Sequence, residues 1–347
     1  MAEKWFVVDA HNQFIPGEAV KKSKGMITDL TVMTPATMPF RGSMNLEAKL
    51  KVMDEAGVDM AVIHMASLNY LGLEFCKAMN DGNARLMKEY PRRFIGLAHL
   101  PLDGGGSPEC LKEVDRAITE LGLGGLALET NTEKTVLGSV ALYPLYEKVS
   151  KLDIPIVIHP AFGARPGLVA EGTPAERLRQ AMHQAVNVEI VNTKACVEAM
   201  FGVLNKFPAI KFLMPHHGGA LPIRQGRMMN GFLPIDFKLP PGAPSGGFAP
   251  RVPRIRKQMG LDKIWNELFD KLYFDTSGFQ GWMPITEATL LTVRPDRLCF
   301  GTDYGFEMME SVDIKGFIDD VKKLKISEAD KRNILGESVR TLFKLKK

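Results

Sequence analysis

The chain contains seven histidines, and six of them stand at or beside the end of a short apolar run. Two such runs, "WFVVDAH" and "IPIVIHP", lead into His11 and His159, and a third, "RLCFGTD", leads into Asp303. Two imidazoles and one carboxylate are a usual ligand set for catalytic zinc, and clustered histidines also serve in proton transfer. The sequence therefore predicts a catalytic centre that contains His11, His159 and Asp303.

Other polar side chains follow apolar runs in the same way, and structural roles are also open to them. His64 and His99 lie inside such runs, where a single hydrogen bond commonly holds a core histidine. Asp275, in "YFDTSG", can bond backbone groups in a turn. Glu129 stands near the end of "GGLALET" and His216 at the end of "IKFLMPH". Of these residues, we take His64 and Glu129 as candidates for substrate binding.

The apolar runs alternate with longer segments of helical pattern. The eight runs are "WFVVDAH" (5–11), "DMAVIHM" (59–65), "FIGLAHL" (94–100), "GGLALET" (124–130), "IPIVIHP" (154–160), "IKFLMPH" (210–216), "LYFDTSG" (272–278) and "RLCFGTD" (297–303). The first helical segment, "NLEAKLKVMDEAG", begins after Ser43-Met44-Asn45 and stops at Gly57, which suits helix capping. Apolar strands joined by helices are typical of a parallel sheet covered by helices.

Eight strand–helix units favour a closed, distorted (β/α)₈ barrel of the TIM type over an open doubly wound sheet. No GxGxxG turn follows the first strand, which argues against dinucleotide binding. Three long segments, about 14–43, 161–195 and 228–265, are expected to form lids on the carboxyl-terminal face, where barrel enzymes build their sites. His183 falls in the second and is expected on a helix surface or in a lid contact. We expect residues 1–347 to form one domain with these inserted lids.

Composition narrows the range of partners. The chain has 45% hydrophobic and 24% charged residues and a net charge of +4 with both signs interspersed. No basic run of the kind that follows a phosphate backbone is present, so nucleic acid is not expected as a partner. The four cysteines form no CxxC pair and are expected in the core. The apolar runs are short, so we expect neither a signal peptide nor a membrane segment, and a cytoplasmic location.

Over nearly its whole length the chain resembles the amidohydrolase superfamily, in the branch that contains aminocarboxymuconate-semialdehyde decarboxylase and the resorcylate decarboxylases. The segments that carry the resemblance are "DAHNQF", "MDEAGVDMAVI" (53–63), "NDGNARLMKEYPRRFIGLAHLPL" (80–102), "ELGLGGLALETN" (120–131), "PLYEKVSKLDIPIVIHP" (144–160), "HHGGALPIRQGRM" (216–228) and "LCFGTDYGFE" (298–307). The resemblance implies a distorted (β/α)₈ barrel with one divalent metal at its mouth, bound by His11, His159 and Asp303. It also implies that His216 acts as acid or base beside the metal.

Gln13 is where the chain departs from this pattern. Relatives carry a second ligand there, in a His-x-His or Glu-x-His pair, whereas this chain offers an amide. An amide oxygen binds zinc more weakly than imidazole does, although it suits harder cations. The metal can stay on the other three ligands, Gln13 can bind it weakly, or the metal can be lost. We expect a retained, loosened site with zinc first, and manganese or magnesium as alternatives.

Arginines near the strand ends are candidates for binding a substrate carboxylate, because a planar guanidinium matches a carboxylate well. They are Arg41, Arg165, Arg224 and Arg227. "LPIRQGRM" places the last two one helical turn apart. A surface or structural ion pair is the alternative role for any one of them.

The expected reaction is metal-dependent, non-oxidative decarboxylation of a small hydroxylated aromatic or unsaturated carboxylate, as in the breakdown of aromatic compounds. Asp303 or His216 would then protonate the carbon that bears the carboxylate. The alternative is a hydrolase or hydratase acting on a lactone, an amide or a ring-fission product, with Asp303 as base. A third possibility is a protein that has lost catalysis and only binds a small carboxylate or scaffolds an oligomer. The resemblance also implies a homodimer or higher homo-oligomer.

Overall fold

A computed structural model of the chain describes residues 4–23, 43–161, 174–229 and 265–346. Its strands are β1 (Val8–Gln13), β2 (Met60–His64), β3 (Phe94–Gly96), β4 (Ala98–His99), β5 (Leu126–Glu129), β6 (Pro155–His159), β7 (Lys211–Met214), β8 (Tyr273–Asp275) and β9 (Leu298–Cys299). Only Leu97 separates β3 from β4, so these two are parts of one interrupted strand. The strands therefore fall on the eight predicted apolar runs.

All strand pairs are parallel and follow the order of the chain, β1 to β3 and then β4 to β9. Backbone hydrogen bonds join β1 to the segment that follows β9. The Ala10 N–H donates to the Phe300 carbonyl at 2.7 Å, and the Asp303 N–H donates to the His11 carbonyl at 2.9 Å. The ring of strands thus closes as a parallel barrel, which confirms the predicted (β/α)₈ class.

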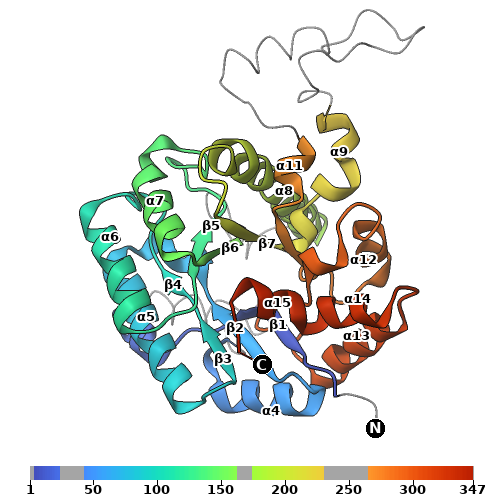
Figure 1. The fold of residues 1–347 in the computed structure, drawn as a ribbon. Helices are drawn as coiled ribbons and strands as arrows, with labels where there is room; N and C mark the ends of the chain where they lie inside the picture. The colour runs from blue at the N-terminus through green and yellow to red at the C-terminus, as the bar shows by residue number, and fades with distance from the viewer. Residues whose placement is uncertain (1–3, 24–42, 162–173, 230–264, 347) are drawn as a thin grey trace, which may run out of the picture.

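Helices surround the strands in Figure 1. They are α1 (Gly17–Lys22), α4 (Leu46–Ala56), α5 (Leu73–Glu89), α6 (Pro108–Asp115), α7 (Tyr143–Leu152), α8 (Pro174–Val197), α9 (Leu221–Met229), α11 (Trp265–Phe269), α12 (Met283–Thr289), α13 (Ser311–Lys323), α14 (Glu328–Arg332) and α15 (Ser338–Leu342). Shorter 3₁₀ or π turns are η1 (Ala66–Leu71), η2 (Arg116–Glu120), η3 (Val140–Leu142), η4 (Glu198–Leu204), η5 (His216–Gly218), η7 (Pro295–Arg297) and η8 (Asn333–Glu337).

Helix α4 shows how local sequence sets these bounds. The Asn45 side chain accepts a hydrogen bond from the Ala48 N–H, which satisfies one free donor of the first turn. Gly57 ends the helix in the left-handed region at φ 81°, where a residue without Cβ avoids strain. Both caps lie at the predicted boundaries.

The core has two layers because side chains alternate across each strand. One layer fills the barrel and consists mainly of small and branched residues: Val8, Ala10, Val62, Ile95, Leu97, Ala127, Val157, Leu213, Tyr273 and Cys299. Val339 and Leu342 of α15 pack against this layer and cover one end of the barrel. The larger layer lies between strands and helices. All four cysteines are buried and unpaired, in agreement with the sequence.

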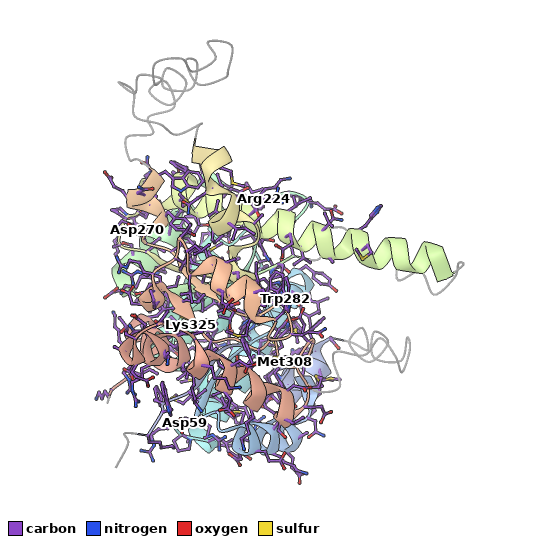
Figure 2. The ribbon with its side chains drawn as sticks, turned by 90° about the vertical axis from the view of Figure 1, so that its right-hand side faces the viewer. Asp59, Arg224, Asp270, Trp282, Met308 and Lys325 are labelled. Carbon is purple, nitrogen blue, oxygen red and sulfur yellow. The ribbon has the colours of Figure 1, made fainter. Side chains whose placement is uncertain are left out.

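The predicted lids coincide only partly with described residues. Helix α1 belongs to the first segment, and α8 makes up most of the second and extends away from the body in Figure 2. Residues 24–42, 162–173 and 230–264 lie outside the described residues, so the lids and the single-domain organisation stay predictions. Within the described ranges, no helix is both long enough and apolar enough to cross a membrane.

Candidate functional site

Polar side chains line one mouth of the barrel because the strands share a pattern. On a strand, residues two apart face the same side, so a polar residue two positions after an interior apolar one also faces inward. The pairs are Val62 and His64, Leu97 and His99, Ala127 and Glu129, Val157 and His159, and Tyr273 and Asp275. All of these polar residues are buried, and each stands at the carboxyl end of its strand. The mouth is therefore lined by a buried polar layer, which lies next to the apolar layer that fills the barrel.

Strand β1 reaches the same layer through an irregularity. Its pairing with β2 changes register between Asp9 and Asn12. His11 consequently lies among the interior histidines, with ring centroids 4.9 Å from His64 and 5.2 Å from His159. Asn12 instead turns to the other side, where its amide donates to Asp9 Oδ2 at 2.7 Å.

His11, His159 and Asp303 form a compact group at this mouth. One ligand atom of each lies within 4.8 Å of the other two, and all three residues are buried. Nε2 of His11 is 3.5 Å from Oδ1 of Asp303. The structure thus brings together three residues that are far apart in the sequence, in the arrangement expected of a metal site.

The Nδ1 atoms of His11 and His159 each lie within hydrogen-bond distance of other groups. Nδ1 of His11 lies 2.9 Å from Oδ2 of Asp275 and 3.1 Å from Oγ of Ser277. Nδ1 of His159 lies 2.9 Å from the Pro160 carbonyl oxygen. A hydrogen bond to one ring nitrogen fixes the tautomer and directs the opposite nitrogen, Nε2, to a metal.

Gln13 lies between the members of this group. Its Nε2 donates a short hydrogen bond to Oδ1 of Asp303 and lies 3.2 Å from Nε2 of His159. Its Oε1 is buried and has no hydrogen-bond partner among the described residues. The amide that replaces the expected ligand therefore still occupies the ligand position, and a turn of the amide would present its oxygen there.

The residues fit a divalent cation. Nε2 of His11, Oε1 of Gln13 and Nε2 of His216 are all buried, and none has a hydrogen-bond partner within the described part of the chain. Unpaired buried polar atoms are costly, and several together at one place indicate a missing partner. Because two of these atoms are nitrogens and one is an amide oxygen, beside the Asp303 carboxylate, a divalent metal ion would satisfy them.

The imidazole of His11 interacts electrostatically with the carboxylates of Asp275 and Asp303. Burial lowers the pKa of His11, but the carboxylates of Asp275 and Asp303 outweigh burial and raise that pKa to about 9. Burial raises the pKa of Asp275, but the neighbouring His11 outweighs it, and the pKa falls well below its ordinary value. A cation that binds His11 must displace the proton from Nε2, so metal uptake should release protons.

His216 stands beside the group on η5. Its N–H donates to Oδ1 of Asp275 at 3.0 Å, and its Nε2 lies 3.7 Å from Oδ2 of Asp303. Its backbone is in the left-handed region, at φ 50°. Burial lowers the pKa of His216, while the Asp303 carboxylate acts in the opposite direction. A buried imidazole with an open nitrogen beside the ligands is suited to proton transfer.

Two other histidines have structural roles. Nε2 of His99 accepts from the Met65 N–H at 2.9 Å, and its Nδ1 lies 3.1 Å from the Leu97 carbonyl oxygen. Nδ1 of His217 lies 3.1 Å from Oγ1 of Thr289. Burial lowers the pKa of each to about 4, so both are neutral near pH 7.

The substrate-binding candidates lie in different surroundings. His64 is part of the histidine cluster, and Glu129 is buried beside it, with its Cα paired to that of His159 and its pKa raised by burial to about 8. Arg224 is exposed on α9 (Figure 2). Arg41 and Arg165 lie outside the described residues, as does the side chain of Arg227. His183 is exposed on α8, as expected.

Lys49 is a residue that the sequence reasoning missed. It lies on α4, is fully buried, and donates to the Gln13 carbonyl at 3.0 Å and to Oδ1 of Asn12. Its ammonium lies 4.2 Å from the centroid of the Tyr304 ring. Through Asn12 it connects to Asp9, which accepts from both the N–H and the hydroxyl of Thr302. This network joins β1, which carries His11, to the segment after β9, which carries Asp303.

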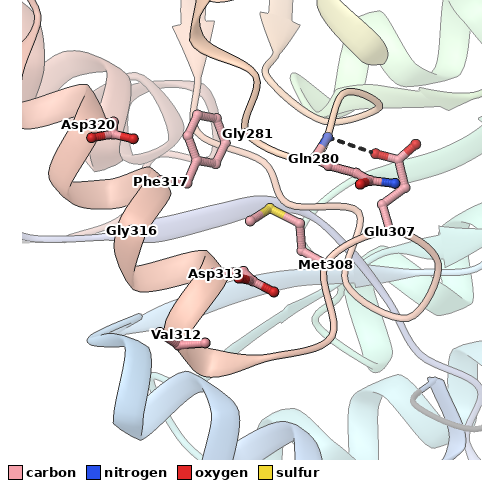
Figure 3. Close-up of a pocket in the computed structure, with 9 residues that line it drawn as sticks. All are labelled: Gln280, Gly281, Glu307, Met308, Val312, Asp313, Gly316, Phe317 and Asp320. Atoms are coloured by element: carbon pink, nitrogen blue, oxygen red, sulfur yellow. Dashed lines mark hydrogen bonds between the residues drawn. The ribbon is translucent and has the colours of Figure 1, made fainter.

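A separate cleft of about 370 Å³ lies between the segment after β9 and helix α13 (Figure 3). Its acidic lining residues are Glu307, Asp313 and Asp320. Burial raises the pKa of Glu307 to about 7, and Asp303 adds to this effect. None of the metal-ligand candidates lines this cleft, and three carboxylates would repel a carboxylate substrate, so the barrel mouth remains the candidate site.

The fold agrees with the comparisons to known proteins. The chain belongs to the amidohydrolase family, whose model matches residues 8–345. It is 28% identical over 266 residues to 2-amino-3-carboxymuconate-6-semialdehyde decarboxylase of Dictyostelium discoideum, and the aligned region covers 76% of this chain and 65% of that protein. It is 26% identical over 316 residues to gamma-resorcylate decarboxylase of Polaromonas sp., and the aligned region covers 86% of this chain and 87% of that protein.

A solved structure with the same fold is 5-carboxyvanillate decarboxylase from Novosphingobium aromaticivorans, in complex with manganese and 4-hydroxy-3-methoxy-5-nitrobenzoic acid. The two superpose with a TM-score of 0.74 over 98% of this chain and 96% of that one, at 19% identity. The likeness supports the barrel fold of the chain.

Proposed function

We propose that this protein is a metal-dependent, non-oxidative decarboxylase of a small hydroxylated aromatic or unsaturated carboxylate. The observation that carries the proposal is the open Nε2 of His216 beside the compact group of His11, His159 and Asp303. A proton donor next to a cation site is the minimum that such a reaction needs. The named decarboxylases among its relatives support the same reaction.

In this proposal His11, His159, Asp303 and the amide oxygen of Gln13 hold the metal. When bound, a divalent cation would act as a Lewis acid and as a template for the substrate's carboxylate and an adjacent oxygen. Zinc is the first expectation, and manganese, present in the Novosphingobium structure, is the alternative. Magnesium fits less well because two of the four ligands are imidazoles.

The side chains carry the proton. His216, in its protonated form, donates from Nε2 to the carbon that bears the carboxylate, and Asp303 is the alternative donor. The bond to the carboxylate then breaks, CO₂ leaves, and the bonding pair restores the unsaturated system. The lowered pKa of His216 makes its imidazolium a stronger acid for this step. Asp275 keeps His216 in place through the backbone N–H.

Elemental analysis and a substrate screen test the proposal. Protein purified without chelator should hold about one equivalent of zinc or manganese, and Asp303→Asn and His159→Ala should lose it. The native protein should release CO₂ from one or more hydroxybenzoates and leave lactones and ring-fission products unchanged. Hydrolysis or hydration without CO₂ release would contradict the reaction, and a protein unable to take up metal would contradict the site.

The remaining expectations concern the whole protein. We propose a homodimer or higher homo-oligomer and a cytoplasmic location, together with Arg224 and Arg227 as contacts for the substrate carboxylate. Sedimentation of the native protein tests the first. Arg224→Ala and Arg227→Ala test the last, since each should raise KM more than it lowers kcat if it only binds the carboxylate.

A further inference from the structure

Both ring nitrogens of His64 are buried, and the described residues supply no hydrogen bond to either of them. It ends β2 and is fully buried. His99, which ends β4, is equally buried but has both nitrogens bonded. A buried imidazole with neither nitrogen paired is strongly unfavourable, so His64 must find a partner in the working protein.

The neighbours of His64 indicate what that partner is. The ring centroids of His11, His64 and His159 are 4.9, 5.2 and 5.6 Å apart, so they form a nearly equilateral triangle. A ring nitrogen about 2.1 Å from a metal places the ring centroid about 3.2 Å away, and two such rings at 90° to 120° are then about 4.5 to 5.5 Å apart. Two of the three spacings fall in this range, and the third exceeds it by about 0.1 Å. His64 is not yet part of the compact group of His11, His159 and Asp303, so its ring has to turn for a nitrogen to reach the same ion.

Strand pairing places His64 next to the position of the amide. The Cα atoms of Gln13 and His64 are partners in the β1–β2 ladder, and the Phe14 N–H donates to the His64 carbonyl at 3.1 Å. Gln13 already uses its Nε2 on Asp303. An imidazole from β2 therefore lies beside the point where β1 presents only a neutral amide.

We propose that His64 is a further protein ligand of the metal, supplied by β2 where the amide of Gln13 stands on β1. This inference rests on the proposed metal site. Hydrogen bonds hold Nδ1 of His11 and Nδ1 of His159 in place, whereas none constrains the His64 ring, which can turn toward the ion. With His64, three imidazoles and one carboxylate accompany the Gln13 amide oxygen, and this set favours zinc or another transition metal over magnesium.

The first test measures metal affinity by chelator competition on the native protein and on His64→Asn. Loss of an outer hydrogen bond to a ligand costs about 10- to 100-fold in affinity, so loss of a direct ligand should raise the zinc Kd by about 100-fold or more. The magnesium Kd should change little. His99→Asn is the matched control, because it removes a buried strand-end imidazole that already has partners, and it should leave the zinc Kd unchanged.

A second variant tests the position of the ligand. Gln13→His in the His64→Asn background should restore zinc affinity, since Gln13 already lies 3.2 Å from Nε2 of His159. If native protein holds one zinc and His64→Asn binds zinc with the native Kd, His64 is no ligand, although the proposed function stands. A native protein that takes up no metal would instead overturn the proposed function itself.

A measurement without substitution covers the case in which His64→Asn does not fold. X-ray absorption of the zinc-loaded native protein counts coordinated imidazoles. Three would support ligation by His64, and two, from His11 and His159, would overturn it. The latter result would make His64 a substrate contact.

Discussion

His11 and Asp275 form a fully buried pair in which Nδ1 of the imidazole lies 2.9 Å from Oδ2 of the carboxylate. The other oxygen of the same carboxylate accepts from the His216 N–H at 3.0 Å. One aspartate at the end of β8 therefore fixes both a proposed metal ligand and the proposed proton donor. Mutation of this residue should therefore affect both metal binding and the placement of the proton donor.

Asp275→Asn should raise the metal Kd by about 10- to 100-fold, because an amide replaces the charged partner of His11 while its size is kept. Chelator competition measures the change. Ser277→Ala is the control, since Ser277 also contacts Nδ1 of His11 but carries no charge, and its effect should be smaller. If Asp275→Asn bound the metal with the native Kd, His11 would not need a carboxylate next to its Nδ1 to bind the metal.

His216→Asn should lower kcat by about 100- to 10,000-fold, the usual contribution of a positioned acid or base. Metal content should stay near the native value, because His216 lies beside the ligands and is not one of them in our proposal. Elemental analysis and CO₂ release from the same preparation measure both quantities. A large loss of metal in this variant would reassign His216 as a ligand.

The absence of a side chain at Gly278 leaves room for the His216 ring. A Cβ at Gly278 would lie 2.5 Å from Cγ of His216 and 2.8 Å from its Nδ1, and the backbone φ is +88°. Gly278→Ala should therefore displace the imidazole and lower kcat by up to about 100-fold, the cost of misplacing a reacting group by about 1 Å.

Gly57→Ala is the matched control for this variant. Gly57 has a similar φ of +81°, and nothing lies within 4 Å of an added Cβ. Both substitutions should lower the free energy of unfolding by about 1 to 3 kcal/mol through backbone strain. Only Gly278→Ala should change kcat, and equal kcat values in the two variants would show that His216 is not displaced.

The sequence predicted the barrel because each strand is a short apolar run and helical segments separate the runs, with caps such as Asn45 and Gly57 at the ends of α4. It also predicted the grouping of His11, His159 and Asp303, because the carboxyl ends of parallel strands meet at one mouth. These inferences need only local pattern and the closure of the sheet.

Other features depend on contacts that local pattern does not reveal. Regular alternation after Val8 and Ala10 would turn Asn12 into the barrel, and only the register change in β1 places His11 there. A signal for Lys49 was present, since it shares the buried face of α4 with Met53 and Ala56. The unpaired state of His64 and the double role of Asp275 depend on side chains from other strands, so they could be found only in the folded structure.

The buried, neutral state of His99 gives a stability prediction that is independent of the metal. Its pKa is about 4 in the folded protein, against about 6.5 when exposed, so on acidification the unfolded chain takes up the proton first. The stabilisation from the neutral His99 imidazole is fully present above pH 6.5, and about 3 kcal/mol of it is lost as the pH falls to 4.

His99→Asn should therefore destabilise the protein more at pH 7 than at pH 4.5, as measured by urea unfolding of metal-free protein. His183→Asn, which replaces an exposed imidazole on α8, is the control, and an equal effect of His99→Asn at both pH values would contradict a neutral, buried His99.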